Sequence, residues 1–327
     1  MTEVVTLGEC MGVLYPEQPV TLDAATTLTL DIGGAEANLA IRLSRLGHTT
    51  RFISRVGDDP FGRRIRATLA ANAVDTSCLI TDRVDPTGVF FREWLPDGAR
   101  RAYYYRAGSA ASRMAPEDLR PTMFAGARIV HLTGITPALG QSCAQTVMRA
   151  IELARAAGAL VSLDPNYRSS LWQAGATRAA LLPIIAQADI LLMGHEDAQA
   201  LLGADDREAI MDHGTALGVR VVVLKRAEHG ADAQADGQRV HVPAYPVRQV
   251  IDPVGAGDAF DAGFLAGWLR GYDLGAALDL GARCGAVAVA ALGDYAGTLE
   301  EETGGALMPR KRRAAIAEHL KYADPAE

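Results

Sequence analysis

The chain has 327 residues, 49% of them hydrophobic, and a formal net charge of −7. This length and composition suffice to bury an ordinary hydrophobic core. The negative charge argues against nucleic acid or an anionic membrane surface as a general partner, because it adds to the repulsion from phosphate groups. The four scattered cysteines lack CxxC spacing, so we expect reduced thiols and a cytoplasmic protein.

We expect no export signal, no membrane-spanning segment, no zinc site and no nucleic-acid-binding segment. The chain opens in an apolar strand-like run without the features of an export signal. The most apolar later stretch, residues 284–292, is too short to span a bilayer, so no membrane association is expected. The histidines are dispersed, which argues against a zinc site. The basic run RKRR at 310–313 is typical of the solvated face of a terminal helix.

Short β-rich apolar runs alternate with helical patterns along the chain. Leu39, Leu43 and Leu46 share one helical face that ends at Gly47, and a similar pattern ends before Gly158. This alternation predicts an α/β fold with a mainly parallel sheet covered on both faces. The expected strands are residues 4–7, 52–56, 129–132, 160–163, 190–193 and 221–224.

Two segments interrupt this rhythm. Residues 10–32 are strand-like and contain two prolines, and residues 87–106 are typical of two strands joined by a turn at 96–98. Neither has a helix to form a crossover, so both are predicted to lie outside the main sheet as a small β-structured lid. Without an internal repeat or a low-complexity linker, residues 1–327 are expected to form one domain with this inserted lid.

The strongest motif lies late in the chain, where DPVGAGD at 252–258 precedes an apolar helical run. Small residues allow a close backbone approach, and the free amides of a helix N-terminus bind an anion such as phosphate. Asp258 would repel phosphate unless it faces the attacking group, which suits a base that accepts a hydroxyl proton. Taken alone, the motif fits equally well a glycine-rich turn in which Asp258 caps the helix.

A second glycine-containing segment, GGAEANLA at 33–40, precedes the first helical pattern. Gly33 and Gly34 would let backbone amides and the side chain of Asn38 approach a polyhydroxylated ligand closely. A helix-start turn packed under a loop accounts for the same residues, and by itself it is the better interpretation.

Together, the two segments resemble the signatures of the ribokinase-like, or PfkB, carbohydrate kinases. Residues 252–258 resemble the C-terminal signature DTxGAGD, with Pro253 where Thr is usual, and residues 33–62 resemble the N-terminal signature. The resemblance therefore covers nearly the whole chain. It implies a ribokinase-like three-layer α/β/α fold with a small β-sheet lid, and ATP-dependent phosphorylation of a sugar. The implied catalytic groups are Asp258 with Gly255, Ala256 and Gly257, and the implied sugar contacts near the N-terminus are Gly34, Ala35 and Asn38.

The nucleotide and metal sites follow from the same resemblance. The chain has no GxxxxGK[ST] segment and no protein-kinase catalytic loop, which disfavours both of those enzyme classes. The family uses ATP and Mg²⁺, and its NxxE segment corresponds here to GHED at 194–197, so Asp197 or Glu196 is expected to act on the metal through water. Lys225 matches the nucleotide-binding stretch, although an exposed strand-end lysine is an equal interpretation. The residues implied for the ATP site are Asn166, Gly194, Lys225, Gly230, Gly255, Gly257 and Ala282.

Two features favour an acidic sugar. Arg168 follows the strand expected at 160–163, where α/β sheets place ligand groups, and it can hold a carboxylate bidentately. In the lid, Tyr103 and Tyr105 share one strand face and could stack on a sugar. A β-sheet dimer interface explains the tyrosines equally well, and it suggests a homodimer through the lid.

This subset of residues is similar to the 2-keto-3-deoxygluconate kinases within the wider family. The resemblance implies phosphorylation of the terminal C6 hydroxyl of that sugar acid. Asp294, otherwise a plain turn aspartate, joins the implied contacts, which are Gly34, Tyr103, Tyr105, Arg168, Asp258 and Asp294.

Three alternatives compete with this prediction. A kinase of the same fold could act on a neutral sugar such as fructose or ribose. A Rossmann dehydrogenase would need GxGxxG after the first strand, and the sequence there does not supply it. A catalytically silent sugar-binding regulator would be expected to lack a residue like Asp258. A monovalent cation such as K⁺ near Asp252 is a further candidate cofactor.

Overall fold

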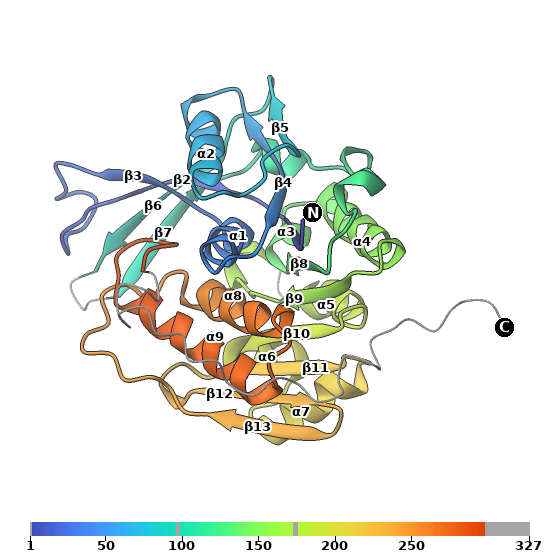
Figure 1. Cartoon of the computed structure of the whole chain (residues 1–327). Helices are drawn as coiled ribbons and strands as arrows, with labels where there is room; N and C mark the ends of the chain where they lie inside the picture. The colour runs from blue at the N-terminus through green and yellow to red at the C-terminus, as the bar shows by residue number, and fades with distance from the viewer. Residues whose placement is uncertain (1, 96–98, 173–175, 298–327) are drawn as a thin grey trace.

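A computed structural model describes residues 2–95, 99–172 and 176–297 of the chain (Figure 1). The basic run at 310–313 and the turn predicted at 96–98 lie outside these residues. Helices cover both faces of a large sheet, and a smaller sheet stands at one side (Figure 1). The predicted α/β class with a mainly parallel sheet and a small second sheet is confirmed.

The large sheet has nine strands within the described residues, in the order β13-β12-β11-β10-β9-β8-β1-β4-β5. From β11 to β5 all neighbouring strands are parallel, whereas β12 and β13 are antiparallel additions at one edge. The strands are β1 (Val4–Leu7), β4 (Thr50–Gly57), β5 (Leu79–Asp82), β8 (Ile129–Thr133), β9 (Leu160–Asp164), β10 (Ile190–Gly194), β11 (Val221–Lys225), β12 (Ala231–Ala235) and β13 (Gln238–Val242).

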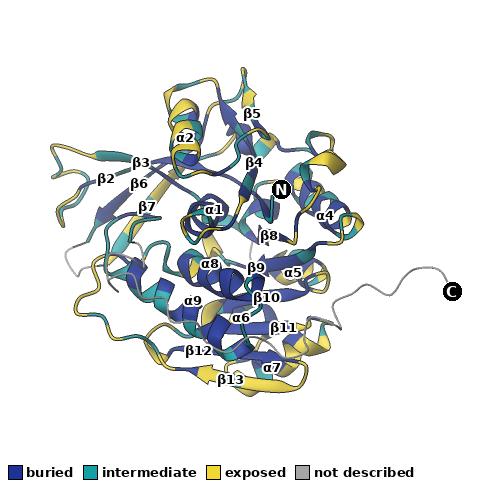
Figure 2. Ribbon diagram, in the orientation of Figure 1, coloured by how far each residue is buried: buried dark blue, intermediate teal, exposed yellow. Residues whose placement is uncertain are grey.

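Both faces of this sheet are covered because its central strands are apolar on both sides. One core cluster packs the sheet against α1, α8 and α9, and another packs the opposite face against α4, α5, α6 and α7. Figure 2 shows the central strands and α8 as buried. The helices are α1 (Ala35–Arg45), α2 (Pro60–Ala71), α3 (Ile135–Ala138), α4 (Gln141–Ala156), α5 (Ala176–Ile185), α6 (His195–Leu202), α7 (Arg207–Ala216), α8 (Ala256–Leu269) and α9 (Leu274–Val289).

Local sequence explains where several helices begin. At α2, Asp59 accepts a 2.8 Å hydrogen bond from the amide of Gly62, and Pro60 occupies the first helical position. At α9, Asp273 accepts a 2.7 Å bond from the amide of Ala276. The helix α8 is apolar almost all round, as expected for a helix enclosed by the sheet and α9.

The small sheet has the strand order β3-β2-β6-β7 within the described residues. Its antiparallel pair β6–β7 corresponds to the two strands predicted within 87–106, and β2 pairs with β6 in parallel, so two segments far apart in the sequence form one sheet. Its strands are β2 (Met11–Tyr15), β3 (Thr29–Gly33), β6 (Val89–Trp94) and β7 (Arg100–Tyr105).

The helices in the described ranges are all too short, or not apolar enough, to cross a bilayer.

Candidate active site

Polar side chains gather at the carboxyl edge of the large sheet. Asp164 is the last residue of β9 and Lys225 is the last residue of β11, with β10 between them. The helix α8 begins beside these strand ends, since a Cβ added to Gly257 would lie 3.7 Å from Nζ of Lys225. The first amides of α8 therefore lie where open α/β sheets bind anionic ligands.

Asp258 lies in the first turn of α8 and is held by the side chain of Asn38 from α1. The Nδ2 atom of Asn38 donates a 2.7 Å hydrogen bond to Oδ2 of Asp258. Burial raises the pKa of Asp258, and the bond from Asn38 acts in the opposite direction. The Oδ1 atom of Asn38 is buried and has no hydrogen-bond partner among the described residues. A buried acceptor of this kind requires a donor, and a ligand hydroxyl could supply it.

The glycine before α8 is required by the backbone. Gly255 has a φ of +75°, and a Cβ there would overlap the carbonyl oxygen of Asp294. The loop at 252–255 and the turn that contains Asp294 are therefore in direct contact. This packing places Ala256 and Gly257 in the first turn of α8, with Gly257 exposed.

Lys225 is enclosed by carboxylates. Its Nζ lies 2.9 Å from Oδ2 of Asp164 and 3.0 Å from Oδ1 of Asp261, the latter on α8. Burial would lower the pKa of Lys225, but the charges of the two aspartates outweigh it and raise that pKa. Burial also raises the pKa of Asp261 well above its ordinary value. The ammonium group predicted to bind nucleotide is thus partly buried between two carboxyl groups rather than exposed at the strand end.

Asp197 caps its own helix. Its carboxylate accepts backbone hydrogen bonds of 2.7 Å from Tyr167 and 2.6 Å from Gly194. Burial, aided by the charge of Asp164, raises the pKa of Asp197 to about 6. Both oxygens are engaged by amides, while the adjacent Glu196 is exposed.

The tyrosines of β7 lie on two different faces of the small sheet. Tyr104 stacks on Phe90, with ring centroids 5.3 Å apart, and lies on the face that packs toward the turn at Asp294. Tyr103 and Tyr105 share the opposite face, where Tyr103 donates a 2.6 Å hydrogen bond to Glu93. The structure therefore does not bring these two tyrosines together with Asp258.

Arg168 lies beyond the end of β9 and is exposed. Burial is the main influence on the pKa of Asp258, and the positive charge of Arg168 opposes it, which puts the two groups within electrostatic range. Asn166, two residues earlier, has a φ of +41° and donates its amide to Oδ1 of Asp164 at 2.9 Å. The segment after β9 thus forms a turn that presents an exposed guanidinium.

The other predicted residues are tightly packed. A Cβ on Gly34 would overlap the carbonyl oxygen of Glu9, so this glycine serves a close backbone contact, while Ala35 begins α1. Gly230, with a φ of +81°, packs against the carbonyl of Val242. Ala282 is buried on α9, which lies against α8.

Sequence reasoning missed several charged residues at this edge. Asp261 could have been found from the sequence, because it stands three residues after Asp258 and therefore on the same side of that helix. Arg92 had none, because its partners Asp252 and Asp294 lie 160 and 202 positions away. Glu36 is buried and accepts hydroxyl hydrogen bonds from Thr133 at 2.6 Å and Thr136 at 2.8 Å. Burial raises the pKa of Glu36 to about 7.

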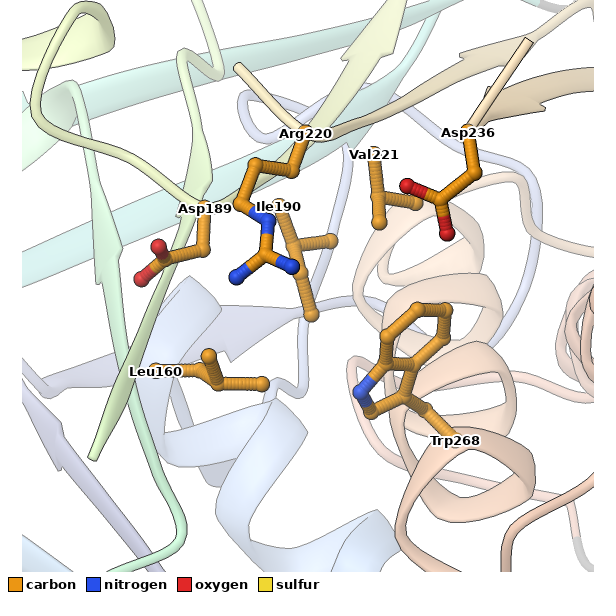
Figure 3. A pocket seen from close by; sticks show the side chains of 7 residues that line it. All are labelled: Leu160, Asp189, Ile190, Arg220, Val221, Asp236 and Trp268. Atoms are coloured by element: carbon orange, nitrogen blue, oxygen red, sulfur yellow. The ribbon is translucent and has the colours of Figure 1, made fainter. Parts of the chain in front are cut away.

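A small pocket lies at the opposite, amino-terminal edge of the large sheet (Figure 3). Trp268 from the end of α8 and Arg220 before β11 line it, together with Asp189 and Asp236 (Figure 3). Its space of about 10 Å³ is open to solvent on one side and corresponds to about one water molecule. This pocket is separate from Asp258 and too small for a sugar or a nucleotide.

Comparison with known proteins agrees with this geometry. Residues 1–301 match the model of the pfkB family carbohydrate kinases. The chain is 36% identical to 2-dehydro-3-deoxygluconokinase from Thermoproteus tenax, over 90% of this chain and 90% of that protein. It is 37% identical to a fructokinase from Klebsiella pneumoniae, over 80% of this chain and 86% of that protein.

Solved structures share the fold. A PfkB protein from Polaromonas sp. JS666 has a TM-score of 0.83 at 34% identity, covering 90% of this chain and 98% of that one. A fructokinase double mutant from Vibrio cholerae O395, in a form with fructose, ADP and potassium ion bound, has a TM-score of 0.81 at 26% identity, covering 91% and 96%. The fold and the edge site define a kinase that acts on small molecules. The chain belongs to the pfkB family of carbohydrate kinases.

Proposed function

We propose that this kinase transfers the γ-phosphoryl group of ATP to the C6 hydroxyl of 2-keto-3-deoxygluconate, also called 2-dehydro-3-deoxygluconate. The observation that carries the proposal is the carboxylate of Asp258, held by Asn38 at the N-terminus of α8. The similarity to the Thermoproteus tenax enzyme supports the choice of sugar. We place the reaction in the cytoplasm, whose reducing conditions would keep the four free cysteines as thiols.

Asp258 acts as the general base. Because Oδ2 accepts the bond from Asn38, Oδ1 remains to take the proton of the sugar hydroxyl. The hydroxyl oxygen then forms a bond to the γ-phosphorus while the bond to the β-phosphate oxygen breaks and ADP leaves. The amides of Gly255 and Gly257 stabilise the charge on the transferring group, joined by the amide of Ala256 when it exchanges its 3.3 Å bond to the carbonyl of Pro253 for the phosphate. The unpaired Oδ1 of Asn38 accepts a hydrogen bond from the sugar.

The ATP site lies along the ends of β9, β10 and β11. We propose that Asn166, Gly194, Lys225, Gly230 and Ala282 line it, and that Lys225 contributes by fixing Asp164 and Asp261 as much as by its own charge. No group of three metal-binding side chains occurs within the described residues, which fits Mg²⁺ because that ion is held mainly by substrate phosphates and water. Asp197 and Glu196 would hold its water ligands, and the bound ion would neutralise phosphate charge.

Arg168 supports an acidic sugar over a neutral one. It is exposed, close enough to affect Asp258, and able to form a charge-assisted pair with a carboxylate. Gly34, Ala35 and Asp294 complete the proposed contacts, together with Tyr104 from the small sheet, which replaces Tyr103 and Tyr105 in this role because of its orientation.

The small sheet is proposed to act as the lid of this site and to join two copies of the chain. Tyr103 and Tyr105 are exposed on its outer face, and Tyr105 packs edge-on against Phe91. An exposed aromatic sheet face of this kind is typical of an interface. Light scattering after size exclusion should report a dimer, and Tyr105→Glu should shift it to a monomer. A monomeric wild-type protein would contradict the dimer.

A neutral sugar is the alternative, favoured by the 37% identity to a fructokinase. The deciding experiment measures kcat/KM with Mg-ATP for 2-keto-3-deoxygluconate, fructose, ribose and gluconate. We expect the keto-deoxy acid to exceed fructose by about 100-fold, the value of a well-formed charge-assisted pair. Phosphorus NMR of the product should show coupling to the two protons on C6. Equal or better turnover of fructose would replace the substrate assignment, and coupling elsewhere would replace the C6 position.

A further inference from the structure

A buried arginine of the small sheet reaches the loop that precedes α8. Arg92 on β6 is 4% exposed, and its Nη1 donates a 3.1 Å hydrogen bond to Oδ2 of Asp252. Its Nη2 lies 3.1 Å from Oδ1 of Asp294. The guanidinium also stacks on Tyr15, with its carbon 4.6 Å from the ring centroid. One side chain therefore bridges two buried aspartates and is fixed in place by an aromatic ring.

The two aspartates enclose the glycine on which α8 starts. Asp252 stands three residues before Gly255, and the carbonyl of Asp294 packs directly against Gly255. The amides that follow Gly255 form the anion-binding end of α8. A displacement of Asp252 or Asp294 would therefore shift the positions of these amides. Arg92 thus determines where this loop lies relative to the small sheet.

A monovalent cation does not fit beside Asp252 in this structure. Oδ2 of Asp252 accepts from Arg92 and, at 3.4 Å, from the amide of Gly293. Oδ1 accepts a 3.2 Å bond from the amide of Val254 and lies 4.0 Å from Nε of Arg100. The carboxylate is thus surrounded by donors and two guanidinium groups. A further cation there would be repelled by both guanidinium groups.

We propose that the guanidinium of Arg92 takes the place of a bound monovalent cation at Asp252 and positions the loop before α8. Arg92 is in this sense a positioning residue, because it acts on the amides of α8 through Asp252 and Asp294. The consequence for rate rests on the proposed kinase reaction, whereas the consequence for ion binding does not. The chain should therefore need no added K⁺, unlike a kinase whose loop is held by a bound ion.

The first experiment uses the wild-type protein in KCl, NaCl or tetramethylammonium chloride at equal ionic strength. We expect the three melting temperatures to agree, because no cation binds the folded state selectively. We also expect kcat to agree within about twofold, because the loop is already in place. A saturable rise in melting temperature or in kcat that is specific to K⁺ would overturn the proposal. The comparison of melting temperatures does not depend on which sugar is the substrate. It therefore tests this proposal separately from the choice of sugar.

The second experiment removes the guanidinium. In Arg92→Met, kcat should fall by about 100-fold through misplacement of the loop, with a smaller change in the KM for sugar. Its melting temperature should acquire a dependence on K⁺ or guanidinium ion that the wild type lacks, and guanidinium at low concentration should restore part of kcat. Unchanged kcat without any response to cations would overturn the proposal.

Two further variants complete the design. Arg149→Met removes a guanidinium from an exposed ion pair with Glu152 on α4 and should behave as the wild type. Arg92→Lys keeps one positive charge but loses the forked geometry that reaches two carboxylates. If Arg92→Met does not fold, Arg92→Lys decides: kcat should fall by about tenfold and recover partly with guanidinium. A wild-type kcat in Arg92→Lys would contradict the bridging role.

Discussion

The side-chain amide of Asn38 donates a 2.7 Å hydrogen bond to the carboxylate of Asp258, across 220 positions of sequence. This contact joins α1 to α8 and brings the two glycine-containing signatures of the chain to one carboxyl group. It also distinguishes the two oxygens of Asp258, because Oδ2 is engaged and Oδ1 is left for a substrate. The proposed base is therefore oriented before any sugar binds.

Replacing Asp258 by Asn should remove the base without removing the fold. We expect kcat to fall by about 100-fold or more, because proton transfer in the transition state loses its acceptor. Burial raises the pKa of Asp258, so the neutral amide should be tolerated and the melting temperature should not fall. Steady-state kinetics and ATP binding by calorimetry test this, with the exposed Asp205→Asn as the matched control. Retained turnover would remove Asp258 from the base role.

The pH dependence of the reaction should respond to Asn38. If Asp258 is the base as proposed, it must be ionised to act, so kcat/KM should decline as pH falls through the pKa of that carboxyl. Burial raises this pKa and the bond from Asn38 lowers it, so Asn38→Ala should raise it further. The acid limb of the kcat/KM profile should then move to higher pH. An unmoved limb would mean that another group controls the acid side.

Arg168 should discriminate between acidic and neutral sugars. In Arg168→Met, kcat/KM for 2-keto-3-deoxygluconate should fall by about 10- to 100-fold, the loss expected for one charge-assisted hydrogen-bonded pair. Turnover of fructose, however slow, should change little, and Arg149→Met serves as the control for the loss of a surface charge. Equal losses for both sugars would give Arg168 a general role in place of recognition of a carboxylate.

The main framework of the fold was predictable because its strands are locally apolar on both faces. All six expected strands occur, and residues 52–56 lie within β4 (Thr50–Gly57). The antiparallel edge pair β12–β13 was missed, although Asp236 and Gly237, both with positive φ, form its tight turn. The strand β12 reads ADAQA, and its alanines carry too little β preference to indicate a strand.

The site was only partly predictable, since motifs report local backbone needs and not long-range partners. The need for a glycine at Gly255 follows from the left-handed turn that precedes α8, so that position could be inferred from the sequence. The pairing of Lys225 with Asp164 and Asp261 depends on three separate elements meeting at the sheet edge. Strand alternation correctly put Tyr103 and Tyr105 on one face, but nothing local says which face of the small sheet turns inward.

Glu36 should make stability depend on pH in a way that one substitution removes. Its carboxyl is buried against Thr133 and Thr136, and burial raises its pKa from 4.5 to about 7. Between these values the folded protein holds a proton that the unfolded chain has released, so stability attributable to Glu36 falls as pH rises. Above pH 7 the folded state carries the full cost of a buried charge, about 3 kcal/mol relative to pH 4.5.

Glu36→Gln keeps the acceptor oxygen for both threonine hydroxyls but never ionises. At pH 4 its free energy of unfolding should match that of the wild type, and at pH 8 it should exceed it by about 3 kcal/mol. Urea unfolding at a series of pH values measures the difference, and comparison with the wild type cancels the contribution of Asp294, whose pKa burial also raises to about 7. Glu152→Gln, an exposed change on α4, should give an offset that is constant with pH. A constant offset in Glu36→Gln as well would mean that this carboxyl is already neutral, or already hydrated, throughout the range.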